Sequence, residues 1–434
     1  MSMPVTVCVQ ELSELINLHL GPDFLEKDPA WQIMDSAISG RGLFATRDIG
    51  TREVILREPA LLAGPKASQS TNLNTCCVCY CQLEGSEEEI MCPHGCTMPL
   101  CKACSSSERH TFECKLFRKW KPKNTTKISR PAIRIVPIIR CLFLNEMQHK
   151  LLYALQANAD KFFKAEIKSA SDCFEEFTQN RDVINYFYRT ICAFNTNAFE
   201  GKSCVGGHEV LIRALFPLAG LMNHQCTPNA NHHFDNGETI VITAARPIKQ
   251  GEEIVTTYTK LLWSTLARKG FMALTKQFMC CCQRCQDPTE NGTYLSALFC
   301  RAQGCKGIVI PVQTKTLQPD WRCTTCESVF PHSKMARYQD FALNTINNRI
   351  NKGSVAEMIT FINDMCPRFC PSSNYVLVEA KLNVIWRMSR PTTEEFNEDH
   401  LKCKERYKEE IVALLEKLGA GDCTLKKLIT EEIL

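Results

Sequence analysis

Cysteine and histidine side chains gather in pairs within one short stretch of the chain. Thiolates and imidazoles separated by two or three residues are typical ligands of tetrahedral Zn²⁺. Eight such ligands would make two closed sites, which indicates structural rather than catalytic zinc. Because so short a stretch buries little surface, the metal would supply its folding energy. The eight predicted ligands are Cys76, Cys79, Cys92, Cys96, Cys101, Cys104, His110 and Cys114.

Neighbouring residues leave the assignment of these ligands open. His94 could replace Cys92 or Cys96, and Cys77 and Cys81 lie close by as alternative thiols. The spacing therefore predicts two zinc ions in this stretch without fixing every ligand.

Three thiolates further along the chain need a fourth ligand. Cys280, Cys282 and Cys285 lie close together in the sequence. Cys226 is the favoured partner, because a zinc ion held there would join the two segments. The alternative is that Cys281 or a cysteine elsewhere completes this site.

A third group of cysteines has the spacing of a zinc ribbon. Cys300 and Cys305 precede a predicted β-hairpin, and Cys323 and Cys326 follow it. We expect one structural zinc ion here, which brings the total to about four. The alternative is a small hairpin with unligated cysteines.

A separate set of motifs carries polar groups that could bind a small molecule. The Gly-Arg-Gly turn at residues 40–42 would let backbone approach a ligand closely. Asn223 and His224 could bind an adenosine or amino acid moiety, and Tyr258 offers a phenol at the end of a predicted strand. Taken singly, His224 and Tyr258 are more typical of a core histidine and a buried tyrosine.

The composition predicts a soluble globular protein. Its 434 residues, 44% hydrophobic and 23% charged, allow two to four domains. The net charge of +4 predicts no strong attraction to nucleic acid or membranes, and no apolar run is long enough to span a membrane. Because the N-terminus lacks the features of a signal peptide, we expect an intracellular protein whose 27 cysteines stay reduced.

Short strands and turns should position the polar motifs. Residues 31–62 and 209–258 alternate short β-type runs with turns, whereas residues 133–200 are mainly helical in pattern. From about residue 336 onward, apolar positions recur at helical spacing.

In this order the polar motifs resemble those of a SET domain lysine methyltransferase, and the first cysteine block resembles a MYND finger inserted within it. The chain therefore resembles the SMYD (SET and MYND) family over about residues 31–290. The segment 287–290, Asp-Pro-Thr-Glu, followed by the ribbon, is similar to the arthropod branch.

This resemblance implies an α+β fold. It has a mostly β SET core, an inserted MYND zinc finger and helical insert, a post-SET zinc site, a zinc ribbon and an α-helical C-terminal domain. The expected segments are an N-terminal lead-in (1–30), the first SET part (31–75), the MYND-type finger (76–114), the helical SET insert (115–205), the SET core (206–262), the post-SET zinc region (263–292), the ribbon (293–335) and the helical C-terminal domain (336–434).

The resemblance also implies a protein-lysine N-methyltransferase that uses S-adenosylmethionine. Tyr258 matches the catalytic tyrosine, which would orient a neutral lysine amine for in-line attack on the methyl group. The residues that match the cofactor pocket are Gly40, Arg41, Gly42, Asn197, Asn223, His224, Tyr258 and Phe278.

Some positions depart from the family pattern. Lys276 stands where active relatives commonly have an aromatic wall of the lysine channel, and Arg41 where Asn or Lys is frequent. The gap between Cys101 and Cys104 is one residue shorter than usual. The alternative function is therefore a catalytically weak or inactive SET–MYND adaptor or transcriptional regulator.

The implied partners are a lysine-containing protein, histone or other, and proline-rich peptides that bind the MYND module. We expect a monomer in the nucleus and cytoplasm, with no membrane association. DNA binding is a minor alternative, since basic residues could neutralise phosphates but the finger lacks the pattern of a groove-reading helix. Those basic residues are Lys115, Arg118, Lys119, Lys121, Lys123 and Lys127.

Overall fold

The computed structural model describes most of the chain. The described residues are 7–66, 75–83, 91–123, 133, 136–158, 167–168, 171–205, 208–235, 237–312, 315–348, 352–365 and 368–431. Of the basic residues considered for DNA binding, Lys127 lies outside them. Within this part of the chain, no helix has the length and apolar character needed to cross a membrane.

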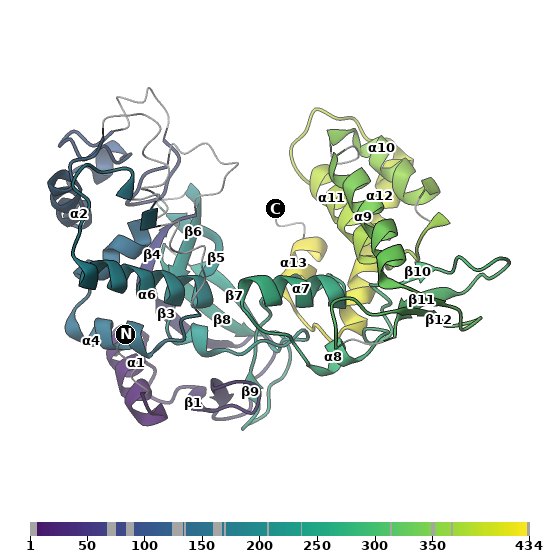
Figure 1. The fold of residues 1–434 in the computed structure, drawn as a ribbon, viewed down its shortest axis with the longest axis horizontal. Helices are drawn as coiled ribbons and strands as arrows, with labels where there is room; N and C mark the ends of the chain where they lie inside the picture. Colours follow the sequence, from purple (N-terminus) through teal and green to yellow (C-terminus); the bar gives the residue numbers. More distant parts are fainter. Residues whose placement is uncertain are drawn as a thin grey trace.

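Three small antiparallel sheets form the N-terminal half (Figure 1). In each sheet, strands from before the cysteine-rich block pair with strands from after it, so the block is looped out of a continuous β core. The sheets are, in order, β1 (Trp31–Asp35), β2 (Arg41–Ala45) and β9 (Glu253–Ile254); β3 (Val54–Pro59), β8 (Thr239–Ala244) and β7 (Ala230–Asp235); and β4 (Leu62–Pro65), β6 (His208–Leu215) and β5 (Phe199–Val205).

Helices cover this core on one side. α1 (Val9–Phe24) buries Leu12 and Ile16, and contacts β1, β3 and α4 (Glu146–Ala154). α6 (Arg181–Asn197) ends just before β5 begins. The helical part of the expected 115–205 insert therefore stops at Asn197, because residues 199–205 pair with β6 along their whole length.

A buried arginine joins the cysteine-rich segment to the β core. Arg140 Nε donates to Glu113 Oε1 at 2.6 Å, and Glu113 lies on α2 (Glu108–Lys119) of that segment. The same guanidinium donates to the Tyr80 hydroxyl at 2.8 Å, the Cys77 carbonyl at 2.8 Å and the Ala63 carbonyl on β4. Because both charges are buried, each depends on the other to offset its lost hydration.

The C-terminal half is a ribbon followed by helices (Figure 1). α7 (Thr265–Thr275) and α8 (Gln283–Gln286) lead into it from the β core. The confirmed α+β fold thus has a helical C-terminal region, as the sequence predicts. The elements that follow are β10 (Leu298–Phe299), β11 (Ile308–Pro311), β12 (Trp321–Cys323), β13 (Val329–Phe330), α9 (His332–Asn348), α10 (Val355–Thr360), α11 (Tyr375–Met388), α12 (Glu398–Lys417) and α13 (Thr424–Thr430).

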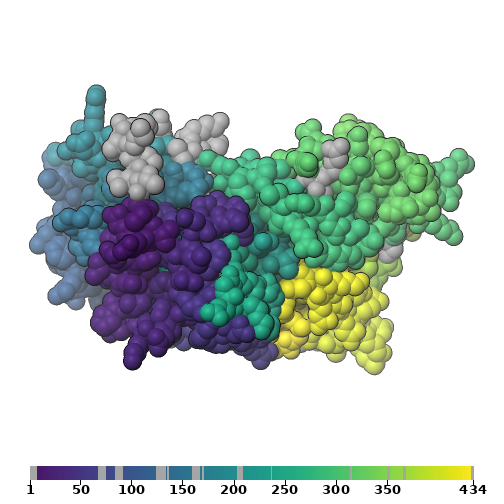
Figure 2. Space-filling model, turned by 90° about the horizontal axis from the view of Figure 1, so that it is seen from below, coloured from purple at the N-terminus to yellow at the C-terminus, as the bar shows by residue number. Residues whose placement is uncertain are grey.

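The end of the chain returns to the β core, where Figure 2 shows it in contact with the N-terminal half. Asp422 N–H donates to the Ala245 carbonyl at 2.7 Å, and its carboxylate pairs with Arg52 at 2.6 Å. Asn231 on β7 donates to the Asp422 carbonyl at 2.9 Å. Gly421 has φ +57°, and a Cβ there would lie 2.3 Å from the Ala245 oxygen, so this contact requires glycine.

We expect the Arg140→Met variant to lose about 3–5 kcal/mol of unfolding free energy, because Glu113 would remain as a buried, unpaired charge. Chemical denaturation followed by tryptophan fluorescence measures the loss.

Arg57→Met is the matched control. It breaks an exposed pair with Asp235, in which the side chains are 48% and 39% exposed, and should cost less than about 1 kcal/mol. Equal losses in the two variants would contradict the role given to Arg140.

Candidate functional site

The fold brings the predicted metal ligands together in four groups of four. Within each group the ligand atoms lie within 4.8 Å of one another, a geometry compatible with a zinc ion. In the first cysteine block the pairs interleave, so the first pair joins the third and the second joins the fourth. The groups are Cys76, Cys79, Cys101 and Cys104; Cys92, Cys96, His110 and Cys114; Cys226, Cys280, Cys282 and Cys285; and Cys300, Cys305, Cys323 and Cys326.

The residues considered as alternative ligands lie beside these groups. His94 donates its backbone N–H to Cys92 Sγ at 3.4 Å, and Cys81 Sγ lies 3.3 Å from Cys79 Sγ. Cys281 is exposed and is not part of the third tetrad. The favoured ligand assignments therefore match the groups that the fold assembles.

Two buried arginines surround the Cys226 tetrad. Arg268 Nε lies 3.2 Å from Cys226 Sγ, and Arg284 Nη1 donates to the Cys226 carbonyl at 3.0 Å. Glu290 pairs with Arg268 at 2.9 Å and lies 3.5 Å from Arg284. Four thiolates around Zn²⁺ would carry a net charge of −2, which the two guanidinium groups offset in part, because they also pair with Glu290. No spacing links these arginines to the cysteines, so the sequence carries no signal for their role.

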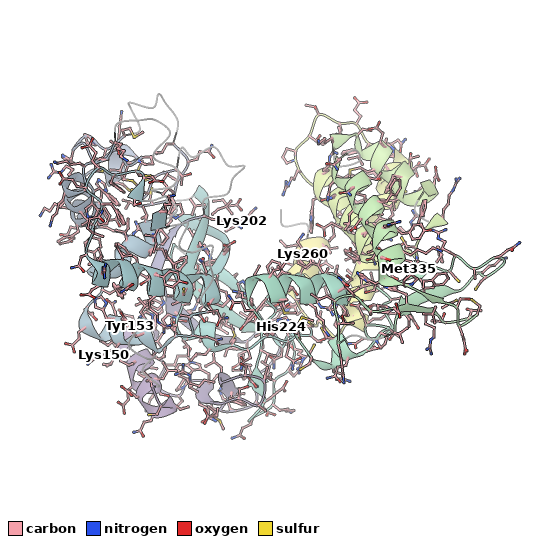
Figure 3. The ribbon with its side chains drawn as sticks, in the orientation of Figure 1. Lys150, Tyr153, Lys202, His224, Lys260 and Met335 are labelled. Carbon is pink, nitrogen blue, oxygen red and sulfur yellow. The ribbon has the colours of Figure 1, made fainter. Side chains whose placement is uncertain are left out.

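His224 connects this tetrad to Tyr258. The Tyr258 backbone N–H donates to His224 Nδ1 at 3.0 Å, so the proton of the neutral ring lies on Nε2, 3.2 Å from Cys226 Sγ. Burial lowers the pKa of His224 to about 4, which keeps the ring neutral. Figure 3 shows His224 near the middle of the molecule, where the N-terminal sheets meet α7.

Asn223 holds the glycine turn in place. Its side-chain amide donates to the Ser39 carbonyl at 3.1 Å, the Arg41 carbonyl at 3.2 Å and Glu253 Oε1 at 2.7 Å. A Cβ at Gly42 would lie 2.4 Å from Glu253 Oε1, so a larger residue would displace the carboxylate that holds Asn223.

The remaining predicted cofactor residues lie around this turn and near Tyr258. The Arg41 guanidinium donates to the Ala154 carbonyl at 2.8 Å, and the Asn197 amide to the Gln156 and Ala193 carbonyls at 2.7 Å. The Phe278 ring is 37% exposed, with its centroid 6.0 Å from that of His224 and 6.4 Å from that of Tyr258.

The Tyr258 hydroxyl donates to the Met222 carbonyl at 2.8 Å. Burial, with a smaller effect of the Glu253 charge, raises the pKa of Tyr258 to about 12, so the phenol stays protonated at neutral pH. Met222 follows the short helix η3 (Ala219–Leu221). Glu58 on β3 positions that helix by accepting the Leu218 and Ala219 N–H groups at 2.7 Å.

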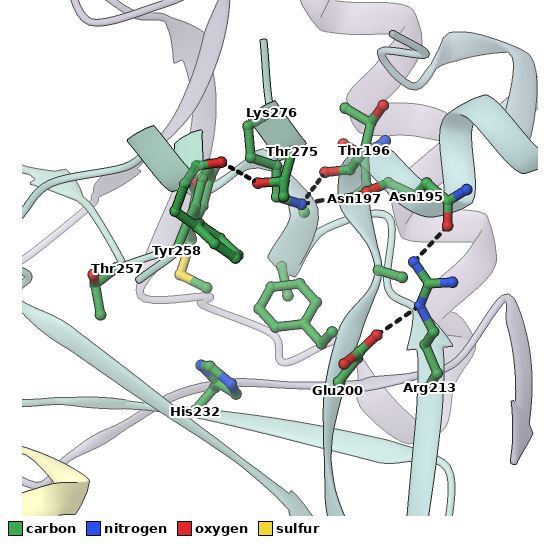
Figure 4. Close-up of a pocket in the computed structure, with 16 residues that line it drawn as sticks. Asn195, Thr196, Asn197, Glu200, Arg213, His232, Thr257, Tyr258, Thr275 and Lys276 are labelled. Carbon is green, nitrogen blue, oxygen red and sulfur yellow. Dashed lines mark hydrogen bonds and ion pairs between the residues drawn. The ribbon is translucent and has the colours of Figure 1, made fainter. Parts of the chain in front are cut away.

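A cavity of about 370 Å³ opens on one side of Tyr258 (Figure 4). Tyr258 and Asn197 line it, whereas residues 40–42 and Asn223 do not. Lys276 points into this cavity and not to solvent, because its Nζ donates to the Thr196 carbonyl at 2.7 Å. Tyr258 therefore lines the cavity, and the segment of His224 and Asn223 links it to the glycine turn.

Comparisons with known proteins agree with this geometry. The SET domain family matches residues 40–259. The chain is 63% identical over 432 residues to the SET domain-containing protein SmydA-8, isoform B, of Drosophila melanogaster, across 99% of this chain and 96% of that protein. The chain belongs to the SMYD family. The relative from Drosophila also agrees with the predicted arthropod branch.

Other SMYD relatives are similar over shorter or equal spans. Isoform A of SmydA-8 from Drosophila melanogaster is 54% identical over 98% of this chain and 92% of that protein. Human histone-lysine N-methyltransferase SMYD3 is 25% identical over 60% of this chain and 62% of its own length. The similarity is thus nearly full-length only to the SmydA-8 proteins among these three.

We expect zinc-loaded chain to contain four zinc ions and Cys226→Ser to contain three, because a serine hydroxyl does not replace a thiolate in a structural site. Elemental analysis after gel filtration gives the number of bound zinc ions, and a thiol-reactive dye reports the cysteines that hold none.

Cys281→Ser is the control, since Cys281 is next to the ligands but outside the tetrad. It should keep all four ions. Loss of zinc from Cys281→Ser and not from Cys226→Ser would reverse the assignment.

Proposed function

We propose that this SMYD chain is a protein-lysine N-methyltransferase that uses S-adenosylmethionine. The observation that carries the proposal is the position of the Tyr258 hydroxyl and the Met222 carbonyl, which lie 2.8 Å apart in the cavity lining, next to the segment that holds the glycine turn. The names of the relatives support it, since human SMYD3 is a histone-lysine N-methyltransferase and Xenopus laevis SMYD2-A an N-lysine methyltransferase.

The residues around the glycine turn fit the cofactor. We assign S-adenosylmethionine to Gly40, Arg41, Gly42, Asn197, Asn223, His224, Tyr258 and Phe278. Gly42 leaves backbone accessible where a side chain would push Glu253 aside, and the partly exposed Phe278 offers an apolar face for a base. When bound, the cofactor supplies an electrophilic methyl group on a sulfonium.

Tyr258 is the catalytic residue in this proposal. Its phenol stays protonated and, with the Met222 carbonyl, orients the acceptor amine that enters from the cavity. In this proposal the donor and acceptor sides meet at Tyr258 and Asn197, which both line the cavity, so that the two groups can approach in line. The Lys276 ammonium in the cavity wall favours the neutral amine, because it repels a second positive charge.

Zinc has a structural role in this mechanism. Each tetrad supplies four protein ligands, so no open position remains for a substrate. The Cys226 tetrad fixes the segment that carries Asn223 and His224. The other tetrads stabilise the first cysteine block and the ribbon.

We also propose that residues 76–114 are a MYND module that binds proline-rich peptides. Its support is the pair of interleaved tetrads and an exposed aromatic side chain, Phe112, which is 59% exposed with its ring centroid 6.2 Å from that of Phe143. We also propose the segments expected from the sequence, with the helical part of the 115–205 insert ending at Asn197. The protein would be a monomer in nucleus and cytoplasm and would act on a histone or other lysine substrate. DNA binding is less favoured, since Lys121 pairs with Glu176.

Lys276 favours one second candidate function, a weak or inactive adaptor. Its ammonium points into the cavity, where it would repel a charged substrate lysine. The retained Tyr258 and Asn223 favour activity.

We expect Tyr258→Phe to lower methyl transfer at least about 100-fold, because the variant loses the hydroxyl that orients the amine. Transfer of radiolabelled methyl to histones and cell-extract proteins measures the rate. Calorimetry should show that the variant still binds the cofactor.

Tyr153→Phe, at a partly exposed tyrosine outside the cavity, is the matched control and should keep full activity. Cofactor binding without any labelling by the unaltered chain would favour the adaptor. Full activity in Tyr258→Phe would remove Tyr258 from the mechanism.

A further inference from the structure

The cavity beside Tyr258 carries an excess of positive charge. Its titratable lining residues are Glu200, Arg213, His232, Tyr258 and Lys276. Glu200 is already paired, with Arg213 Nε at 2.9 Å and Lys66 at 3.1 Å. Burial lowers the pKa of His232 to about 4, so this ring adds no charge at neutral pH.

Lys276 is fixed at both ends. Its backbone N–H donates to the Met272 carbonyl at 2.8 Å at the end of α7, and its carbonyl accepts from Asn158 at 3.0 Å. Its Nζ donates to the Thr196 carbonyl at 2.7 Å and the Asn195 carbonyl at 3.4 Å (Figure 4). The ammonium is therefore held in the cavity wall.

The partners of Lys276 leave its positive charge in place. Its hydrogen-bond partners are two neutral carbonyls, and its Nζ lies 5.5 Å from the centroid of the neutral Tyr258 ring. Among the described residues, no carboxylate lies within 4.0 Å of this Nζ. An ammonium has three N–H donors, of which the carbonyls accept two. One donor and a full charge thus remain for a ligand in the cavity.

We propose that Lys276 determines substrate specificity by selecting a lysine that has an acidic residue beside it. This inference rests on the proposed function. The substrate carboxylate accepts from Lys276 and cancels its charge, so the acceptor amine can enter next to Tyr258. A lysine flanked by basic residues instead meets the charges of Lys276 and Arg213.

The test compares two fluorescein-labelled peptides that differ only in the residues beside one lysine, Glu in the first and Arg in the second. Binding to the full, zinc-loaded chain is measured by fluorescence anisotropy with S-adenosylhomocysteine present. We expect the acidic peptide to bind about tenfold more tightly, as one partly buried charge contact would give. Equal binding, preference for the basic peptide, or no binding of either would overturn the inference.

Two substitutions assign the preference to the ammonium. Lys276→Met, which keeps the length of the side chain, should lower the preference to less than about threefold, and Lys276→Arg should keep it. Lys260→Met is the matched control, since Lys260 pairs with Glu379 outside the cavity. This variant should keep the full preference for the acidic peptide. An unchanged preference in Lys276→Met would overturn the inference.

Raising the pH gives a second readout. Burial, followed by the charge of Arg213, lowers the pKa of Lys276 to about 8, so the side chain is charged at pH 7 and mostly neutral at pH 9.5. The other charged groups that line the cavity are Glu200 and Arg213. His232, with a pKa of about 4, and Tyr258, with a pKa of about 12, stay neutral through this interval. The preference for the acidic peptide should therefore fall at pH 9.5. An equal preference at pH 7 and pH 9.5 would contradict the claim that the Lys276 ammonium causes it.

Binding and turnover separate this inference from the proposed function. A preference for the acidic peptide without methyl transfer would uphold the inference about the cavity and contradict the proposed methyltransferase activity. Methyl transfer without the preference would overturn only the role of Lys276.

Discussion

The Cys226 thiolate is the contact on which the rest of the site depends. It belongs to a tetrad with Cys280 and Cys285, whose sulfurs lie 3.9 and 3.4 Å away, and a zinc ion there would join two segments far apart in sequence. Arg268 and Glu290 form a buried ion pair against it. This arrangement lets four thiolates sit inside the protein, because the surrounding guanidinium groups offset their charge.

The geometry around Tyr258 follows from that contact. His224, two residues before Cys226, accepts the Tyr258 N–H, and Asn223 holds the glycine turn through its amide. The same short segment therefore links Tyr258 to the turn, while residues of α6, β5 and α7 line the cavity that Tyr258 faces. In-line transfer needs the methyl donor and the acceptor amine to meet next to one positioning group, here the Tyr258 hydroxyl.

Local spacing predicted the metal groups, and the order of the polar motifs carried the resemblance to the family, whereas neither predicted the long-range pairing. Zinc ligands come in close pairs, so the sequence was sufficient to find them. Glu290 and Arg268 pair without any such signal. Residues 199–205 were expected in a helical insert, but pairing with β6 makes them a strand. Lys276 could have faced solvent, and only the carbonyls at the end of α6 show that it faces the cavity. The roles of the site residues remain predictions.

A crystal structure of the zinc-loaded chain with S-adenosylhomocysteine and a lysine peptide would test the central claim most directly, which is that Tyr258 separates a donor side from an acceptor side. The account predicts the nucleoside against residues 40–42 and Asn223, and the peptide lysine in the cavity with its amine near the Tyr258 hydroxyl. A nucleoside bound in the cavity, or a lysine bound away from Tyr258, would contradict it.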